Sequence, residues 1–180
     1  YDPVTGRFPQ EDPIGLAGGD VNRYAYVLNQ PTRGSDPLGL TTLIVISKER
    51  TTGIGEHAGL VIIRDGHVEI YDPSGSFSYN GEPLGSGRTI EGGLELLKAY
   101  LDYQRGGGGF AIDPYAFNTT SEEESAIWDA TEEQGGGGVM ECASSVSSVL
   151  TAAKRFKGLG QYHLPGSLAR ALKKLQRIRP

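Results

Sequence analysis

Apolar residues in the first half of this chain follow the patterns of β-strands. Thr42–Ile46 is rich in β-branched residues, which predicts a strand. Two more apolar runs, His57–Ile63 and His67–Tyr71, flank an Arg-Asp-Gly turn at residues 64–66. Because Asp-Gly is a strong hairpin signal, this pattern predicts two antiparallel strands joined by a tight turn.

Helical spacing becomes frequent further along the chain. The segment Ile90–Tyr103 carries Leu94, Leu97, Tyr100 and Leu101 at helical intervals, which predicts a helix whose role is packing. Phe110–Phe117 follows as a short extended piece. Thr120 and Glu123 then form a capping-box pattern that opens another helix. We expect its acidic run Glu122–Glu124 to face solvent and Trp128 to anchor the core.

The single cysteine lies where a glycine-rich run gives way to another helical pattern. The apolar positions of that pattern are Val146, Val149, Leu150 and Ala153. Cys142 is therefore predicted to sit at or near the N-terminus of a helix, where the helix dipole and free N–H groups favour a thiolate. A small buried cysteine without chemistry is the alternative interpretation.

A candidate base and a candidate carboxylate lie in the predicted hairpin. Residues of one parity share a face of a strand, so Asp72 falls on the face of Val68 and Ile70, and antiparallel pairing brings it near His57. The predicted site therefore has Cys142 as nucleophile, His57 as base and Asp72 as the group that orients the imidazole. Asp72 precedes a proline, so a plain turn is its alternative role.

Gln134 precedes Cys142 by eight residues and is a possible oxyanion donor. It fits equally well as the exposed end of the helix that starts after Thr120. The backbone N–H of Cys142 and the turn before it offer another source of oxyanion donors.

Composition narrows the class of protein. The chain has 180 residues, 37% hydrophobic content and 27 glycines, enough for one packed domain with flexible loops and a smaller addition. One cysteine excludes an internal disulfide framework and a cysteine-rich zinc site. A net charge of -5 argues against general phosphate binding, although the C-terminal helix is locally basic. Its basic residues are Arg170, Lys173, Lys174, Arg177 and Arg179.

No run of about 18 apolar residues and no secretory leader is visible, so the sequence predicts neither a membrane span nor a signal peptide. The only methionine is Met140. We therefore expect the chain to be the end of a longer polypeptide.

Residues 1–40 consist of short strand-like pieces separated by Asp-Pro and Gly turns. The pieces read Tyr-Asp-Pro-Val-Thr-Gly-Arg-Phe, Asp-Pro-Ile-Gly-Leu, Asn-Arg-Tyr-Ala-Tyr-Val and Asp-Pro-Leu-Gly-Leu. This segment resembles the terminal stretch of the Rhs/YD-repeat core, a β-cage that encloses a variable C-terminal toxin. The resemblance implies a domain boundary and cleavage site after Leu40, with Asp12 and Asp36 as the autoprocessing pair. Without the resemblance, both aspartates would be read as turn residues.

The order of elements over residues 55–155 resembles the papain-like cysteine hydrolases of circularly permuted type, including NlpC/P60-like and adenain-like peptidases. In these proteins the histidine strand precedes the cysteine helix, as His57 precedes Cys142 here. The resemblance implies an α+β fold for residues 41–180, with an antiparallel sheet packed against helices. Asp-Pro-Ser-Gly at residues 72–75 departs from many NlpC/P60-like members, which place a histidine or another polar residue there.

Both resemblances together imply an interbacterial Rhs effector that acts as a cysteine protease on a target-cell protein. We expect delivery by contact, through type VI secretion, and action in the recipient's cytoplasm rather than its periplasm. The expected partners are the parent Rhs cage and a cognate immunity protein, with no cofactor, metal, nucleic acid or membrane. The same three residues also suit deamidation, acyl transfer or hydrolysis of peptidoglycan peptides. A non-enzymatic toxin that binds its target through the basic C-terminal helix is the alternative from another class.

Overall fold

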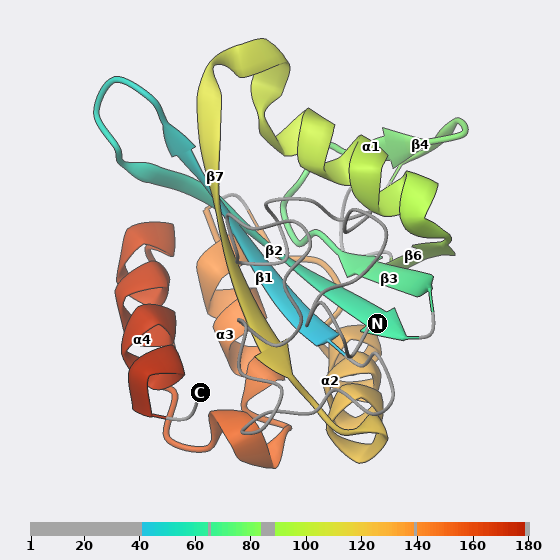
Figure 1. Cartoon of the computed structure of the whole chain (residues 1–180), viewed down its shortest axis with the longest axis vertical. Helices are drawn as coiled ribbons and strands as arrows, with labels where there is room; N and C mark the ends of the chain where they lie inside the picture. The colour runs from blue at the N-terminus through green and yellow to red at the C-terminus, as the bar shows by residue number, and fades with distance from the viewer. Residues whose placement is uncertain (1–40, 65, 84–88, 139, 179–180) are drawn as a thin grey trace, which may run out of the picture.

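A five-stranded antiparallel sheet forms the centre of the computed structural model, which describes residues 41–64, 66–83, 89–138 and 140–178 (Figure 1). The strand order is β6-β3-β2-β1-β7. These strands are β1 (Thr41–Glu49), β2 (Gly55–Arg64), β3 (His67–Tyr71), β6 (Thr89–Gly92) and β7 (Phe110–Asn118). A separate small pair consists of β4 (Ser78–Tyr79) and β5 (Glu82–Pro83). The predicted boundary at Leu40 lies outside the described residues.

Helices cover both faces of this sheet (Figure 1). They are α1 (Leu94–Gln104), α2 (Ser121–Gln134), α3 (Cys142–Leu150) and α4 (Pro165–Ile178), with the short 3-10 helices η3 (Gly106–Gly108) and η4 (Lys154–Phe156). Alternate residues of β1 point to opposite faces, as the pleat requires. Ile44 and Ile46 join a core with α2, α3 and α4, whereas Leu43 and Val45 join a second core with α1. The predicted α+β class is confirmed.

The predicted hairpin is confirmed, and its register determines which part of β2 lies beside the end of β3. Strands β2 and β3 pair from Arg64 opposite His67 to Leu60 opposite Tyr71. β2 continues beyond this pairing towards its start at Gly55, and that stretch remains paired with β1. Asp72, the residue after Tyr71, therefore lies beside the first half of β2, which contains His57. Asp65, in the turn itself, is outside the described residues.

The capping box of α2 is also confirmed. The Thr120 hydroxyl accepts a hydrogen bond from the Glu123 backbone N–H at 3.2 Å, and the Thr120 N–H donates to Glu123 Oε2 at 3.3 Å. Trp128 packs against the α2–α4 core but stays partly exposed, while its neighbour Ile127 is fully buried. Among the described residues, no helix is long and apolar enough to cross a membrane.

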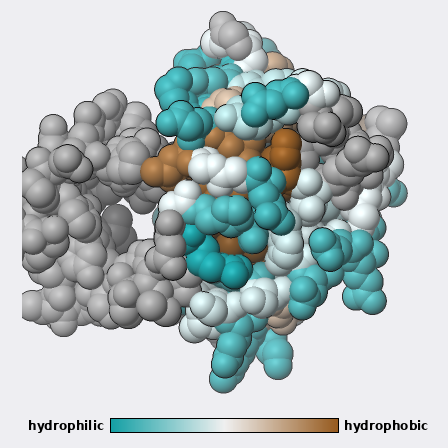
Figure 2. Space-filling view, turned by 90° about the vertical axis from the view of Figure 1, so that its right-hand side faces the viewer, coloured by the Kyte–Doolittle hydropathy of each residue, from teal (hydrophilic) through white to brown (hydrophobic). Residues whose placement is uncertain are grey.

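The helix predicted over Ile90–Tyr103 begins only at Leu94, so the prediction was wrong at its start. Residues Thr89–Gly92 form the edge strand β6 instead, with Ile90 opposite Ile70. Two β-branched residues favour the strand, and Gly92, which ends it, and Gly93, which precedes the helix, mark the change between the two. Figure 2 shows this side of the molecule, where hydrophobic residues reach the surface between polar ones.

Glu124 was predicted to face solvent, but it is completely buried. Its carboxylate accepts hydrogen bonds from Arg64 Nε at 3.3 Å and from the Thr119 hydroxyl at 2.8 Å. Glu69 lies nearby and is 9% exposed, with no hydrogen-bond partner for Oε2 among the described residues. Burial raises the pKa of both carboxyls. Arg64 lowers the pKa of each, and the Thr119 hydroxyl also lowers that of Glu124, but the effect of burial is larger. Glu124 thus departs from the expected solvated face and pairs with the partly exposed Arg64, whereas Glu122 is exposed as predicted.

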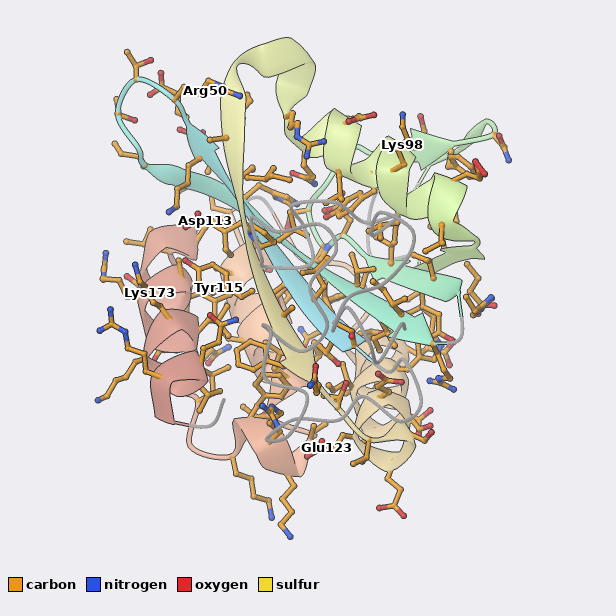
Figure 3. The ribbon with its side chains drawn as sticks, in the orientation of Figure 1. Arg50, Lys98, Asp113, Tyr115, Glu123 and Lys173 are labelled. Carbon is orange, nitrogen blue, oxygen red and sulfur yellow. The ribbon has the colours of Figure 1, made fainter. Side chains whose placement is uncertain are left out.

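Polar contacts join the edge strand β7 to β1 and to α4. The Tyr115 hydroxyl donates to Asp113 Oδ2 at 2.9 Å, and Lys48 from β1 binds the same carboxylate. Burial alone would raise the pKa of Asp113, but these two donors outweigh it and the pKa is lowered. Figure 3 shows Lys173 of α4 on the same side as Asp113 and Tyr115. Gln176 adds a hydrogen bond to the Ala116 carbonyl at 3.0 Å.

The buried Glu69 carboxylate predicts a pH-dependent stability difference. A carboxyl whose folded pKa is raised destabilises the fold above that pKa and costs nothing once both states are protonated. Glu69→Gln should therefore raise the melting temperature at pH 7 by about 2 °C, and the gain should disappear near pH 3. Differential scanning fluorimetry at both pH values measures this. The exposed Glu91, opposite Glu69 on β6, contributes to the raised pKa of Glu69, so Glu91→Gln should give a smaller gain of the same sign.

Candidate active site

Cys142 is the first residue of α3, as the sequence predicted. The residue is 4% exposed and belongs to the core between the sheet and helices α2 to α4. The His57 imidazole and the backbone N–H groups of Ala58 and Ala143 act on its thiol and lower its pKa against the effect of burial. No side chain caps the N-terminus of α3, so its first N–H groups and the helix dipole face this end of the helix.

His57 is the third residue of β2, near the end of the strand that extends beyond β3. Its Nε2 lies 2.5 Å from Asp72 Oδ1. Because an ionised carboxylate only accepts hydrogen bonds, Nε2 carries the proton in this contact. Nδ1 is then the ring nitrogen that remains for the thiol of Cys142. The imidazole therefore links the predicted nucleophile to the predicted carboxylate.

Asp72 follows the last residue of β3 and is completely buried. Besides the His57 imidazole, its Oδ1 accepts the Tyr100 hydroxyl at 2.8 Å and Gln104 Nε2 at 3.4 Å, both from α1. Oδ2 has no hydrogen-bond partner among the described residues. Asp72 was predicted to lie on the same face of the sheet as Val68 and Ile70. This is confirmed, because all three lie on the side that α1 covers.

Two glycines make this close arrangement possible. A Cβ on residue 59 would lie 1.8 Å from the Tyr100 hydroxyl oxygen, and a Cβ on residue 75 would lie 1.7 Å from Asp72 Oδ2. Both distances are far below van der Waals contact. Gly59 lies on the strand beside the imidazole, and Gly75 ends the turn in which its N–H donates to the Asp72 carbonyl at 3.0 Å. The backbone therefore approaches the buried carboxylate from two sides only because these residues lack side chains.

The electrostatics of the site favour a charged pair. Burial by itself lowers the pKa of His57, but hydrogen bonds and charges from Asp72 and Cys142 outweigh it and raise the pKa to about 10. Burial by itself raises the pKa of Cys142, but His57 and the backbone N–H groups outweigh it, so the pKa is lowered. Opposite shifts in the two partners are those of a thiolate paired with an imidazolium.

The glycine-rich segment before Cys142 is tied to the end of β3. The Tyr71 hydroxyl donates to the Gly135 carbonyl at 2.8 Å, and the Ser74 hydroxyl donates to the Gly138 carbonyl. The Glu141 carboxylate accepts the Gly138 N–H at 2.7 Å, so this charge is engaged with the loop next to the thiol. These contacts fix the chain that leads into the N-terminus of α3.

Gln134 is exposed at the end of α2. It lines a surface hollow with Ala130, Glu133, Ser148 and Val149, a set that includes neither Cys142 nor His57. Its role as an oxyanion donor stays a prediction. Asp12, Asp36 and Leu40 lie outside the described residues. Within the described part of the chain, no group of three or more His, Cys, Asp or Glu side chains could hold a metal ion.

Sequence reasoning missed Tyr100 and Gln104 as parts of the site. Both fit the helical pattern of α1, and Tyr100 was assigned to packing alone. Their spacing of four residues places them on one face of the helix, which is the only signal that the sequence carried. That this face meets Asp72 depends on how α1 crosses the sheet.

Comparison with known proteins finds short matches. The chain is 50% identical over 46 residues to the toxin protein Tse5 of Pseudomonas aeruginosa, covering 26% of this chain and 3% of that protein. It is 58% identical over 40 residues to the probable deoxyribonuclease RhsB of Dickeya dadantii, covering 22% of this chain and 3% of that protein. YlbH of Escherichia coli K12 is 40% identical over 70 residues, covering 39% of this chain and 29% of that protein.

The chain thus spans a small part of each of these relatives. No family profile matches it, and no solved structure matches it. The matches to Tse5 and RhsB support the relation to Rhs-type toxins that residues 1–40 predicted.

The close approach of Gly75 to Asp72 predicts a sharp steric effect. Gly75→Ala should destabilise the fold by about 1–3 kcal/mol, because the carboxylate must shift away from its position. We expect a lower melting temperature and slower alkylation of Cys142. Gly93→Ala is the matched control, since a Cβ there meets nothing within 4 Å. Equal effects of the two substitutions would contradict the steric argument.

The paired shifts at Cys142 and His57 predict the pH profile of the thiol. The midpoint for alkylation by iodoacetamide should lie below the ordinary thiol value of about 8.5. The raised pKa of His57 keeps the imidazolium charged up to about pH 10, so the pair should persist from the thiol midpoint to that pH. His57→Gln should move the midpoint back towards the ordinary value. A wild-type thiol that reacts only after unfolding would assign Cys142 to a structural role.

Proposed function

We propose that residues 41–180 form a papain-like cysteine hydrolase domain that cleaves a protein in a target cell. The observation that carries this proposal is that the His57 imidazole, which lowers the pKa of the Cys142 thiol, is hydrogen-bonded to the buried Asp72. A nucleophile, a base and an orienting acid in this order are the parts that acyl-transfer chemistry requires.

The chemistry follows from the charged pair. The Cys142 sulfur attacks the substrate carbonyl carbon, and backbone N–H groups at the start of α3 stabilise the oxyanion that forms. His57 gives its proton to the leaving amine as the C–N bond breaks, which leaves a thioester on Cys142. His57 then takes a proton from water, and the resulting hydroxide attacks the thioester carbonyl carbon. The C–S bond breaks, which releases the acid product and returns the Cys142 thiolate. Asp72 holds the imidazole in orientation and stabilises its charge throughout.

The short matches to Tse5 and RhsB support a toxin role for the chain. On this basis we assign the domain to an interbacterial Rhs effector, delivered by contact and paired with an immunity protein in the producing cell. In the longer parent, cleavage after Leu40 would depend on Asp12 and Asp36. The recipient's cytoplasm is the proposed site of action. The nuclease name belongs to RhsB, of which the match covers 3%.

Deamidation, acyl transfer and hydrolysis of peptidoglycan peptides use the same three residues. Expression of the chain in the cytoplasm and, separately, in the periplasm separates these reactions. Proteomics of newly formed N-termini reports protein cleavage, a mass gain of one unit at glutamine or asparagine reports deamidation, and analysis of cell-wall fragments reports peptidoglycan cleavage. New protein termini that depend on Cys142 are the result that supports the proposal.

The triad predicts a ranking of variants in this toxicity assay. Cys142→Ala and His57→Ala should each abolish toxicity, because nucleophile and base act as a unit. Asp72→Ala should leave activity reduced by about 10² to 10⁴, because the imidazole can still adopt the productive orientation. Glu69 is an acid of β3 whose position has the opposite parity to Asp72. Glu69→Gln is therefore the matched control and should remain toxic. A toxic Cys142→Ala variant would favour target binding through the exposed basic face of α4.

A further inference from the structure

The buried hydroxyl of Tyr100 belongs to the same hydrogen-bond network as Asp72 and His57, two of the three proposed catalytic residues. It donates to Asp72 Oδ1 at 2.8 Å, and the Tyr100 side chain is completely buried. Gln104, one helical turn later on α1, places Nε2 3.4 Å from the same oxygen and is also buried. Neither residue contacts the thiol in any hydrogen bond that the described residues make.

The donors around Asp72 are distributed unevenly. Three of them converge on Oδ1, the oxygen that receives the His57 imidazole, whereas Oδ2 has no hydrogen-bond partner among the described residues. A buried carboxylate stays ionised only when donors compensate for the lost water. Tyr100 supplies the shortest compensating hydrogen bond other than that of the imidazole. Gly59 leaves space for it, since a Cβ there would meet the hydroxyl oxygen at 1.8 Å.

We propose that Tyr100, supported by Gln104, is the positioning residue of this site. Its hydroxyl holds the Asp72 carboxylate turned so that Oδ1 faces the imidazole. Tyr100 acts through Asp72 and touches no reacting atom. The consequence for catalysis rests on the function proposed above.

This role makes a prediction that packing alone does not. Without the hydroxyl, the carboxylate loses a donor and is free to rotate, so the imidazolium is held less firmly opposite the thiolate. The thiolate of Cys142 then forms at higher pH. A tyrosine that only filled space would be replaced by phenylalanine with no change in that pH, because the ring is retained.

The test compares Tyr100→Phe with Tyr103→Phe in the full chain. Tyr103 lies on the same helix, is 43% exposed, and contacts the Phe77 ring at a centroid distance of 5.3 Å. Iodoacetamide alkylation of Cys142 is followed from pH 5 to 10, with circular dichroism to verify folding. In Tyr100→Phe the midpoint should rise by about one pH unit, a tenfold loss of thiolate below the midpoint. Tyr103→Phe should leave the midpoint unchanged.

A double-mutant comparison identifies Asp72 as the intermediary. In an Asp72→Ala background, Tyr100→Phe should change the alkylation rate at pH 6 by less than about twofold, because the shared acceptor is gone. Gln104→Leu, which removes the weaker donor, should shift the midpoint in the same direction by a smaller amount. It also carries the test if Tyr100→Phe melts below the assay temperature.

The outcomes are distinguishable. A wild-type thiol with an ordinary midpoint contradicts both the proposed hydrolase and the role of Tyr100. A wild-type thiol with a low midpoint that is unchanged by Tyr100→Phe, or by Gln104→Leu where that variant replaces it, contradicts the role of Tyr100 alone. Equal effects of Tyr100→Phe with and without Asp72 assign the hydroxyl a structural role and also overturn the inference.

Discussion

A carboxylate without solvent contact is the constraint on which this domain depends. Asp72 is completely buried, and an ionised group in such a place must be compensated by hydrogen-bond donors. The donors come from β2 and from α1, which are separated in the sequence but meet at the end of β3. The glycines beside the carboxylate leave the space that it and the Tyr100 hydroxyl occupy.

The sheet separates the two halves of the candidate site. Asp72 and its partners from α1 belong to one face, while Cys142 and α3 belong to the core on the other face. His57 connects them because β2 extends past the end of β3, which leaves the imidazole within reach of both. The hydrogen bonds from Tyr71 and Ser74 to the glycine-rich loop hold the segment before α3 beside the end of β3. The site is therefore a product of strand lengths as much as of residue identities.

Two kinds of observation contribute to the functional assignment, and they are independent. The short matches to Rhs-type toxins concern stretches of 46 and 40 residues and carry no chemistry for the domain. The geometry around Cys142 concerns chemistry and carries no information on delivery or target. A thiol whose pKa is lowered by an imidazole bound to a buried acid indicates acyl transfer on physical grounds, and the buried acid distinguishes this site from an isolated structural cysteine. The proposal of a toxin with hydrolase activity joins these two separate lines.

The local sequence determined the elements whose signals are short-range. Asp-Gly between two apolar runs predicted the β2–β3 hairpin, Thr120 with Glu123 predicted the start of α2, and the period of two predicted that Asp72 lies on the side of Ile70. From these signals the sequence also predicted that His57 and Asp72 would be neighbours. The predictions at Gln134 and in residues 1–40 had no such local geometry to support them.

Tertiary structure decided what depends on contacts between distant segments. Glu124 has the same local signals as its acidic neighbours, and only the approach of Arg64 and Thr119 makes its burial possible. Ile90 continues a helical pattern, but pairing with Ile70 at the sheet edge gives it a strand conformation. Tyr100 is one apolar position among several on α1, and the angle at which that helix crosses the sheet selects its hydroxyl to meet Asp72. Burial and pairing are set by the whole fold, so no window of the sequence could have supplied them.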